Sequence, residues 1–128
     1  MESLQIQSSN NTPFVSWNPT TAEFVVEGKS FPENTKNFYT PLIQWLNNFE
    51  PGQNEVCFRF GFDYVSSSSV IALLEVLRTI EKLMRRGANI SIVWAYDEGD
   101  EDIQKIGLDF EKLVSIPFSY VEVKETES

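Results

Sequence analysis

Four consecutive serines, Ser66–Ser69, lie where a predicted hydrophobic strand ends and a predicted amphipathic helix begins. Such a junction presents free backbone N–H groups and the positive end of the helix dipole, which together favour an anion such as a phosphate. A hydroxyl cluster at this point is either a helix cap, where serine is a preferred residue, or a place where phosphate is added and removed. The residues of the junction alone leave both interpretations open.

Other catalytic chemistry has little support in the residue types present. The chain contains no histidine, which removes His-based triads, His general bases and His metal ligands. Its one cysteine, Cys57, lies within a predicted strand and is expected to be a buried structural thiol rather than a nucleophile. A single cysteine forms no disulfide within the chain, which suits a reducing compartment. Nucleophilic catalysis would therefore depend on serine with lysine or a carboxylate.

Length and charge narrow the class of protein further. The chain has 128 residues and is expected to form one domain over residues 1–128. Nineteen acidic residues against ten basic ones give a net charge of −9, which argues against nucleic acid or an anionic membrane as a partner. No apolar run approaches the ~20 residues that cross a bilayer, and the first residues show no signal peptide. We therefore expect a cytoplasmic protein.

The first half of the chain predicts an antiparallel hairpin followed by a helix. After an extended start at 4–7, two strands at 12–17 and 22–27 flank a turn. Residues 30–33 read Ser-Phe-Pro-Glu, the spacing of a capping box, so a helix is expected to start there and to continue to Phe49. Pro41 removes one backbone donor inside this helix and predicts a kink or two short segments.

The second half alternates strands with helices. Its predicted elements are a strand at 55–62, a helix at 68–86, a strand at 89–96, a helix near 101–114 and a strand at 118–123. The near-continuous apolarity of 89–96 indicates burial on both faces of that strand. The order ββ-α-β-α-β-α-β predicts an α/β fold with a mostly parallel sheet and an N-terminal antiparallel hairpin.

Two charged segments can each be interpreted as a solvent-exposed structural feature or as a functional site. The acidic run 97–102 could bind a divalent cation, but its glycine is misplaced for a calcium loop, which favours a solvated loop and an acidic helix cap. The bases Arg78, Lys82, Arg85 and Arg86 form a stripe along the long helix that could hold a phosphate or nucleotide. A solvated helix face is the favoured interpretation. No metal or cofactor is expected.

The serine junction and element order resemble the anti-sigma-factor-antagonist (STAS) architecture, in which a phosphorylatable Ser or Thr opens the helix after a central strand. A closer resemblance is to the SiaC family of bacterial regulatory phosphoproteins. The residues that carry it are Gly28-Lys29-Ser30-Phe31-Pro32-Glu33-Asn34, Phe38-Tyr39-x-Pro41-Leu42-x-x-Trp45-Leu46, Tyr64-Val65-Ser66-Ser67-Ser68-Ser69, Trp94-x-Tyr96, Gly107 and Pro117-Phe118.

This resemblance implies a phosphorylation-controlled interaction protein that is not itself an enzyme. A partner kinase would phosphorylate the junction, a phosphatase would reverse this, and the unphosphorylated form would bind and activate a diguanylate cyclase. Ser67 and Ser68 are the predicted phosphoacceptors, and Tyr64, Ser66 and Ser69 are their neighbours. The candidate partner-binding residues are Pro32, Glu33, Asn34, Asp97 and Glu98. The alternative from the residues alone is a small α/β enzyme or nucleotide-binding domain that uses the junction as a phosphate cradle.

Overall fold

The computed structural model describes residues 4–50, 52 and 54–124, which form strands and helices in alternation over most of their length. The elements in chain order are β1 (Leu4–Ile6), β2 (Phe14–Asn18), β3 (Glu23–Ser30), α1 (Thr35–Asn47), β4 (Val56–Val65), α2 (Ser67–Arg85), β5 (Ile90–Asp97), α3 (Glu101–Leu113) and β6 (Phe118–Val123). Within these residues, no helix is long and apolar enough to cross a membrane.

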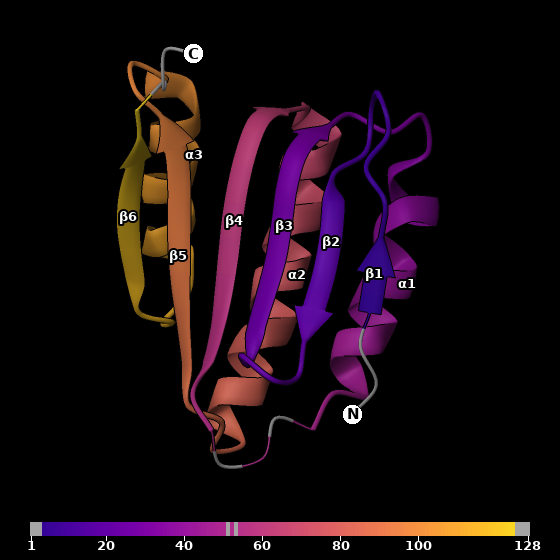
Figure 1. The fold of residues 1–128 in the computed structure, drawn as a ribbon, viewed down its shortest axis with the longest axis vertical. Helices are drawn as coiled ribbons and strands as arrows, with labels where there is room; N and C mark the ends of the chain where they lie inside the picture. The colour runs from indigo at the N-terminus through magenta and orange to yellow at the C-terminus, as the bar shows by residue number, and fades with distance from the viewer. Residues whose placement is uncertain (1–3, 51, 53, 125–128) are drawn as a thin grey trace.

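The strands form one sheet whose spatial order is the order of the chain, from β1 at one edge to β6 at the other (Figure 1). β1 pairs with β2 and β2 with β3 antiparallel, whereas β3, β4, β5 and β6 are parallel. The predicted α/β fold with a mostly parallel sheet and antiparallel N-terminal strands is thus confirmed. The extended start at 4–7 contributes β1 as an additional antiparallel edge strand.

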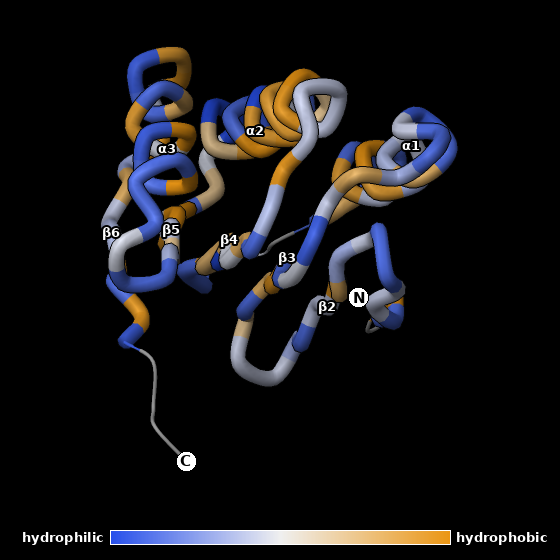
Figure 2. Tube along the Cα trace, turned by 90° about the horizontal axis from the view of Figure 1, so that it is seen from above, coloured by the Kyte–Doolittle hydropathy of each residue, from blue (hydrophilic) through white to orange (hydrophobic). Residues whose placement is uncertain are grey.

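All three helices cover the same face of the sheet, so the fold has two layers (Figures 1 and 2). The core lies between these layers, and its largest fully buried side chains include Trp94, Tyr39, Phe24, Phe58 and Phe60. The expectation that 89–96 is buried on both faces is wrong. Ile90, Ile92 and Trp94 face the helices, while Ser91 and Val93 lie half-buried on the other face. Small apolar residues on the uncovered face made the segment appear doubly buried.

The start of α1 also differs from the prediction. Asn34, not Ser30, is its N-cap, and the Asn34 side chain accepts a hydrogen bond from the Asn37 N–H at 3.1 Å. Ser30 is instead the last residue of β3 and is fully buried, so Pro32 and Glu33 lie in the connecting loop rather than in the first turn. The helix continues through Pro41 as one segment. Ser30 therefore has the spacing of a capping residue, but its side chain is buried at the end of β3 and does not cap the helix.

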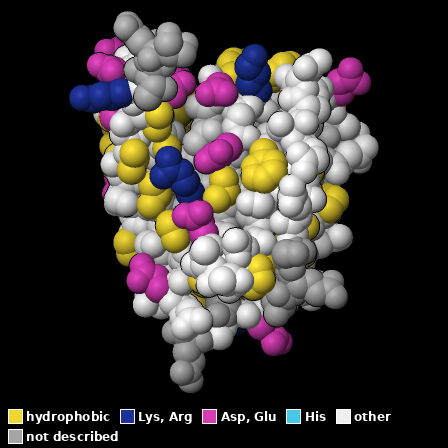
Figure 3. Space-filling model, in the orientation of Figure 1, with side chains coloured by type: hydrophobic (Ala, Val, Ile, Leu, Met, Phe, Trp, Pro, Cys, Tyr) yellow, Lys and Arg dark blue, Asp and Glu magenta, His cyan; other side chains and the backbone are white. Residues whose placement is uncertain are grey.

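The face without helices carries a broad hollow (Figure 3). A cavity of about 450 Å³ is lined there by residues that include Phe14, Glu27, Arg59, Asp63, Asp97 and Val123. Arg59 and Glu27, both in this lining, form an ion pair at 3.6 Å. Cys57 is half-buried rather than part of the core, and burial raises the pKa of its thiol, which disfavours the reactive thiolate.

Candidate functional site

The serine junction is held between the end of β4 and the first turn of α2. Ser66 is the N-cap of α2: its Oγ accepts from the Ser69 N–H at 3.2 Å, and its carbonyl accepts from the Val70 N–H at 2.9 Å. Its own N–H donates to the Ser30 carbonyl at 2.8 Å. This backbone bond extends the β3–β4 pairing to the point where the helix begins. The capping interpretation is therefore correct for Ser66.

Helical periodicity gives the remaining three serines different environments. Ser67 and Ser68 are exposed in the first turn of α2, whereas Ser69 is completely buried. Successive residues of a helix point about 100° apart, so three adjacent serines cannot all face the same side. The four-serine run is therefore one cap, two surface hydroxyls and one core hydroxyl.

The core hydroxyl belongs to a buried network that joins α1, β3 and α2. The Ser30 Oγ donates to the Ser69 Oγ at 2.8 Å and is hydrogen-bonded to the Tyr39 hydroxyl at 2.5 Å. The Ser66 Oγ also donates to the Ser69 Oγ, at 3.0 Å. Burial of Tyr39 raises the pKa of its phenol to about 12, so it stays neutral at physiological pH. The network fixes the junction against the core.

The two surface hydroxyls differ in their contacts. The Ser68 Oγ accepts a hydrogen bond from the Thr35 Oγ1 at 2.9 Å and lies 3.3 Å from the Ser66 Oγ. Thr35 is the first residue of α1, so this bond joins the N-terminal turns of two helices. Within the described residues the Ser67 hydroxyl has no side-chain hydrogen bond. Ser67 thus presents a free hydroxyl to solvent.

The hydrogen-bonding partners of the serines decide what chemistry they support. Among the described residues, every side chain hydrogen-bonded to Ser66, Ser68 or Ser69 is another hydroxyl, and no carboxylate or amine is hydrogen-bonded to them. An activated serine nucleophile needs an adjacent general base, which this arrangement does not supply. The first turn of α2 also carries no acidic side chain, so the free N–H groups there have no resident anion. Within the described residues the junction therefore offers hydroxyls and free backbone N–H groups without an adjacent general base.

Exposed apolar side chains surround the junction. Tyr64, just before it, is 52% exposed and packs edge-to-face against Phe31 with ring centroids 5.6 Å apart. Ile71, one turn after Ser67 on α2, is 74% exposed. The Phe31–Tyr64 pair and Ile71 are therefore candidates for partner-binding residues, because exposed apolar groups mark interaction surfaces.

The candidate partner-binding residues fall into two groups. Pro32, Glu33 and Asn34 lead directly into Thr35 and therefore lie beside the serine junction. Asp97 ends β5 and Glu98 lies in the turn after it, and neither contacts the serines among the described hydrogen bonds and ion pairs; Asp97 instead lines the cavity on the uncovered face. In the rest of the acidic run, Asp100 caps α3 by accepting from the Ile103 N–H at 3.0 Å, as predicted.

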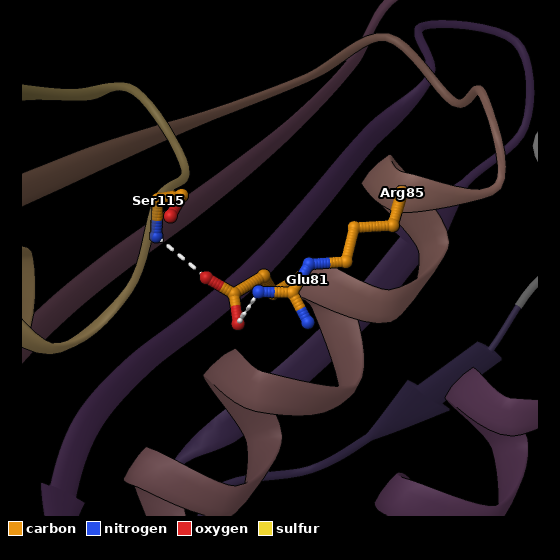
Figure 4. Close-up of polar contacts among 3 residues, drawn as sticks. All are labelled: Glu81, Arg85 and Ser115. Carbon is orange, nitrogen blue, oxygen red and sulfur yellow. Dashed lines mark hydrogen bonds and ion pairs between the residues drawn. The ribbon is translucent and has the colours of Figure 1, made fainter.

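One functional contact of the long helix was missed by the sequence reading. The predicted stripe of Arg78, Lys82, Arg85 and Arg86 is exposed, but Glu81, within the same stretch of helix, is buried. Its Oε2 accepts from the Ser115 N–H at 2.6 Å, and its Oε1 pairs with the Arg85 Nη2 at 3.4 Å (Figure 4). Glu81 therefore fastens α2 to the loop before β6. Its spacing four residues before Arg85 was the available signal.

A two-layer α/β protein that displays unactivated hydroxyls at a helix start, amid exposed apolar side chains, has the features of a regulatory protein that is modified and bound by others. The SiaC family model, described as SiaC family regulatory phosphoprotein, matches residues 6–123. The chain belongs to this family, which confirms the family resemblance of its sequence.

Comparison with known proteins agrees with that assignment. An uncharacterized protein of Pseudomonas aeruginosa strain UCBPP-PA14 is 26% identical over 93% of this chain and 95% of its own length. The crystal structure of apo-SiaC from P. aeruginosa superposes with a TM-score of 0.83 at 24% identity, covering 94% of this chain and 99% of that one. A crystal structure of the diguanylate cyclase SiaD in complex with its activator SiaC, from the same organism, contains a chain with a TM-score of 0.84 at 25% identity, covering 94% and 99%.

Proposed function

We propose that this protein is a phosphorylation-controlled switch that binds and activates a diguanylate cyclase in its unphosphorylated form and is not an enzyme itself. The observation that carries the proposal is the free, exposed Ser67 hydroxyl at the start of α2, in a chain of a regulatory phosphoprotein family. A structurally similar SiaC is the activator of the cyclase SiaD. The cyclase, the kinase and the phosphatase are its proposed partners. Their substrates are nucleotides and phosphoproteins of the cytoplasm, so we propose that the protein acts there.

The phosphoryl group would be accepted at Ser67 or Ser68. In this step the serine Oγ forms a bond to the γ-phosphorus of ATP, the bond to the bridging oxygen of ADP breaks, and the hydroxyl proton passes to the kinase. Ser67 needs no rearrangement, because its hydroxyl is unbonded within the described residues, whereas Ser68 must give up the bond from Thr35. The product carries about −1.5 to −2 charge at the positive end of the helix dipole, so the fold tolerates it.

The same charge would weaken binding to the cyclase. Phe31, Tyr64 and Ile71 offer an apolar surface around the junction, and an apolar interface desolvates whatever lies at its centre. A phosphate there would have to lose its hydration shell on binding. A penalty of ~3 kcal/mol would lower affinity about a hundredfold, because each ~1.4 kcal/mol is a factor of ten.

The test combines modification and binding. The purified protein is incubated with the candidate kinase and Mg-ATP, and intact mass should rise by about 80 Da, the mass of one phosphoryl group. Single Ser67→Ala and Ser68→Ala variants and the double variant identify the acceptor. Cyclase binding and cyclic di-GMP production are then measured with both forms. Equal cyclase affinity of the phosphorylated and unphosphorylated proteins would refute the switch.

A further inference from the structure

The sheet opens between the neighbouring strands β4 and β5 at their carboxyl ends. Pairing between these strands ends at Gly61 and Ala95, although both strands continue beyond these residues (Figure 1). On their other sides the pairing does not stop there, because β3 follows β4 and β6 follows β5 to the last residue of each strand. Within the described part of the chain, residues 62–65 of β4 and 96–97 of β5 therefore have no partner strand on the side of the opening.

The opening coincides with the cavity on the uncovered face of the sheet. Residues from both sides of the opening line this cavity of about 450 Å³: Phe62 and Asp63 from β4, and Tyr96 and Asp97 from β5. A strand beside such a space presents unpaired backbone N–H and C=O groups, and an extended peptide can pair with these groups as an added strand. The backbone at the opening is therefore suited to an extended segment of polypeptide.

Asp63 lies in the open stretch of β4 and is unpaired on the β3 side as well. The register between β3 and β4 shifts there, so that Phe62 and Tyr64 have partners on β3 and Asp63 has none. A bulge of this kind ends regular pairing and redirects a side chain. The Asp63 side chain is exposed and lines the cavity.

The charges of the cavity decide what kind of segment it favours. Its lining contains the carboxylates of Glu27, Asp63 and Asp97 and the guanidinium of Arg59. Arg59 pairs with Glu27, whereas neither aspartate forms an ion pair among the described residues. The excess of negative charge disfavours an acidic segment, a phosphate or a nucleotide and favours a basic side chain.

We propose that the opening between β4 and β5 is a docking site for an extended segment of a partner protein, which pairs with the open edge of β4 and places an arginine or lysine beside Asp63 and Asp97. An arginine is well suited to this position, because its N–H donors can contact carboxylates on more than one side. The open edge of β4 leads directly into the cap residue Ser66, so a segment docked there lies next to the serine junction. The inference does not depend on phosphorylation of any serine or on the identity of the effector.

The experiment titrates ¹⁵N-labelled full-length protein with the blocked pentapeptide Ac-Thr-Val-Arg-Val-Thr-NH2 and follows the backbone amide signals by NMR. One matched peptide has glutamate in place of arginine, and a second is methylated on its backbone nitrogens, which removes the donors that strand pairing needs. Asp63→Asn and Asp97→Asn remove a charge and keep the size of the side chain. Glu122→Gln is the control variant, because Glu122 is an exposed carboxylate near the end of β6 that does not line the cavity.

The arginine peptide is expected to give saturable shifts of the signals of residues 62–65 and 96–97. Each aspartate variant should weaken its binding about threefold, and backbone methylation about tenfold. The glutamate peptide should give no shifts, and Glu122→Gln should leave binding unchanged. The inference is overturned if the arginine peptide shifts none of these signals, if either matched peptide binds as tightly, or if Glu122→Gln weakens binding as much as the aspartate variants. The measurement uses no kinase, phosphate or cyclase, so its failure and a failure of the switch are distinguishable.

Discussion

Replacing Ser69 with alanine tests whether the buried member of the serine run is structural. Ser69 is 0% exposed and accepts hydrogen bonds from the Ser30 Oγ at 2.8 Å and the Ser66 Oγ at 3.0 Å. Without this acceptor the Ser66 hydroxyl can turn toward Ser68 or solvent. The buried Ser30 and Tyr39 hydroxyls still bond to each other, but one of their two protons loses its acceptor. One unsatisfied buried hydroxyl costs ~1–3 kcal/mol, and the better helix propensity of alanine returns ~0.5 kcal/mol.

The expected net loss for Ser69→Ala is therefore ~1.5 kcal/mol of unfolding free energy, with a melting temperature lower by ~5 °C. Urea unfolding followed by tryptophan fluorescence measures it, because Trp17 and Trp94 are buried in the folded state. Ser67→Ala is the control from the same run: it removes an exposed hydroxyl and should change stability by less than ~0.5 kcal/mol. Equal m-values for all variants establish that the unfolded states are comparable.

A double-mutant cycle with Ser30→Ala isolates the bond itself. If the two hydroxyls stabilise the fold through their contact, the double variant should lose ~1 kcal/mol less than the sum of the single losses. The reasoning is refuted if Ser69→Ala is as stable as Ser67→Ala, or if the Ser30 and Ser69 losses simply add. In either case the buried network would not be what holds the junction in place.

Three other perturbations test the contacts that hold the helices on the sheet. In Gly107→Ala, the added Cβ would clash with the Trp94 ring, so despite ~1 kcal/mol of gained helix propensity the net loss should be ~2 kcal/mol, measured by thermal melting; unchanged stability would contradict this packing. Glu81→Ala should cost ~1 kcal/mol by removing the acceptor of the Ser115 N–H, and Glu81→Gln, which keeps an acceptor, should cost less in urea unfolding; the reverse order would exclude the role of the bond. Because the pKa of Tyr39 is about 12 when folded and 10.0 as a reference, its contribution to stability is intact below pH 10 and should fall by up to ~3 kcal/mol between pH 10 and 12. Tyr39→Phe should show a smaller decline, because Tyr120, whose pKa is also raised by burial, still titrates; equal declines in the two proteins would disprove the role of Tyr39.

Hydrophobic periodicity was sufficient to place the elements that carry the site. The helix predicted at 68–86 is observed as Ser67–Arg85, and the apolar positions of β4 alternate as expected, although that strand continues three residues further, to Val65. The extra residues pair with the end of β3, and Lys29 lies opposite Tyr64. No local signal shows this extension, because it depends on a partner strand that is distant in sequence.

The side-chain network could not be read from the sequence for a related reason. Ser30 has the spacing of a capping residue, yet it bonds to Ser69, which is 39 residues away. Thr35 has no motif that links it to Ser68, 33 residues away. Contacts of this kind depend on which helix face meets which strand. The sequence also did not predict that helices cover only one face of the sheet, because Val93 and Ala95 make β5 apolar on its uncovered face as well.

The arrangement of the four serines follows from two independent requirements of one junction. Ser66 and Ser69 satisfy the fold: one caps α2, and the other accepts two hydrogen bonds within the core. Because those positions are three residues apart, they lie on the same side of the helix and leave Ser67 and Ser68 on the other. Ser66 and Ser69 thus hold in place the backbone on which Ser67 and Ser68 are exposed. Modification of Ser67 or Ser68 can change the surface without disturbing the cap, and this separation is what a reversible switch at a helix start requires.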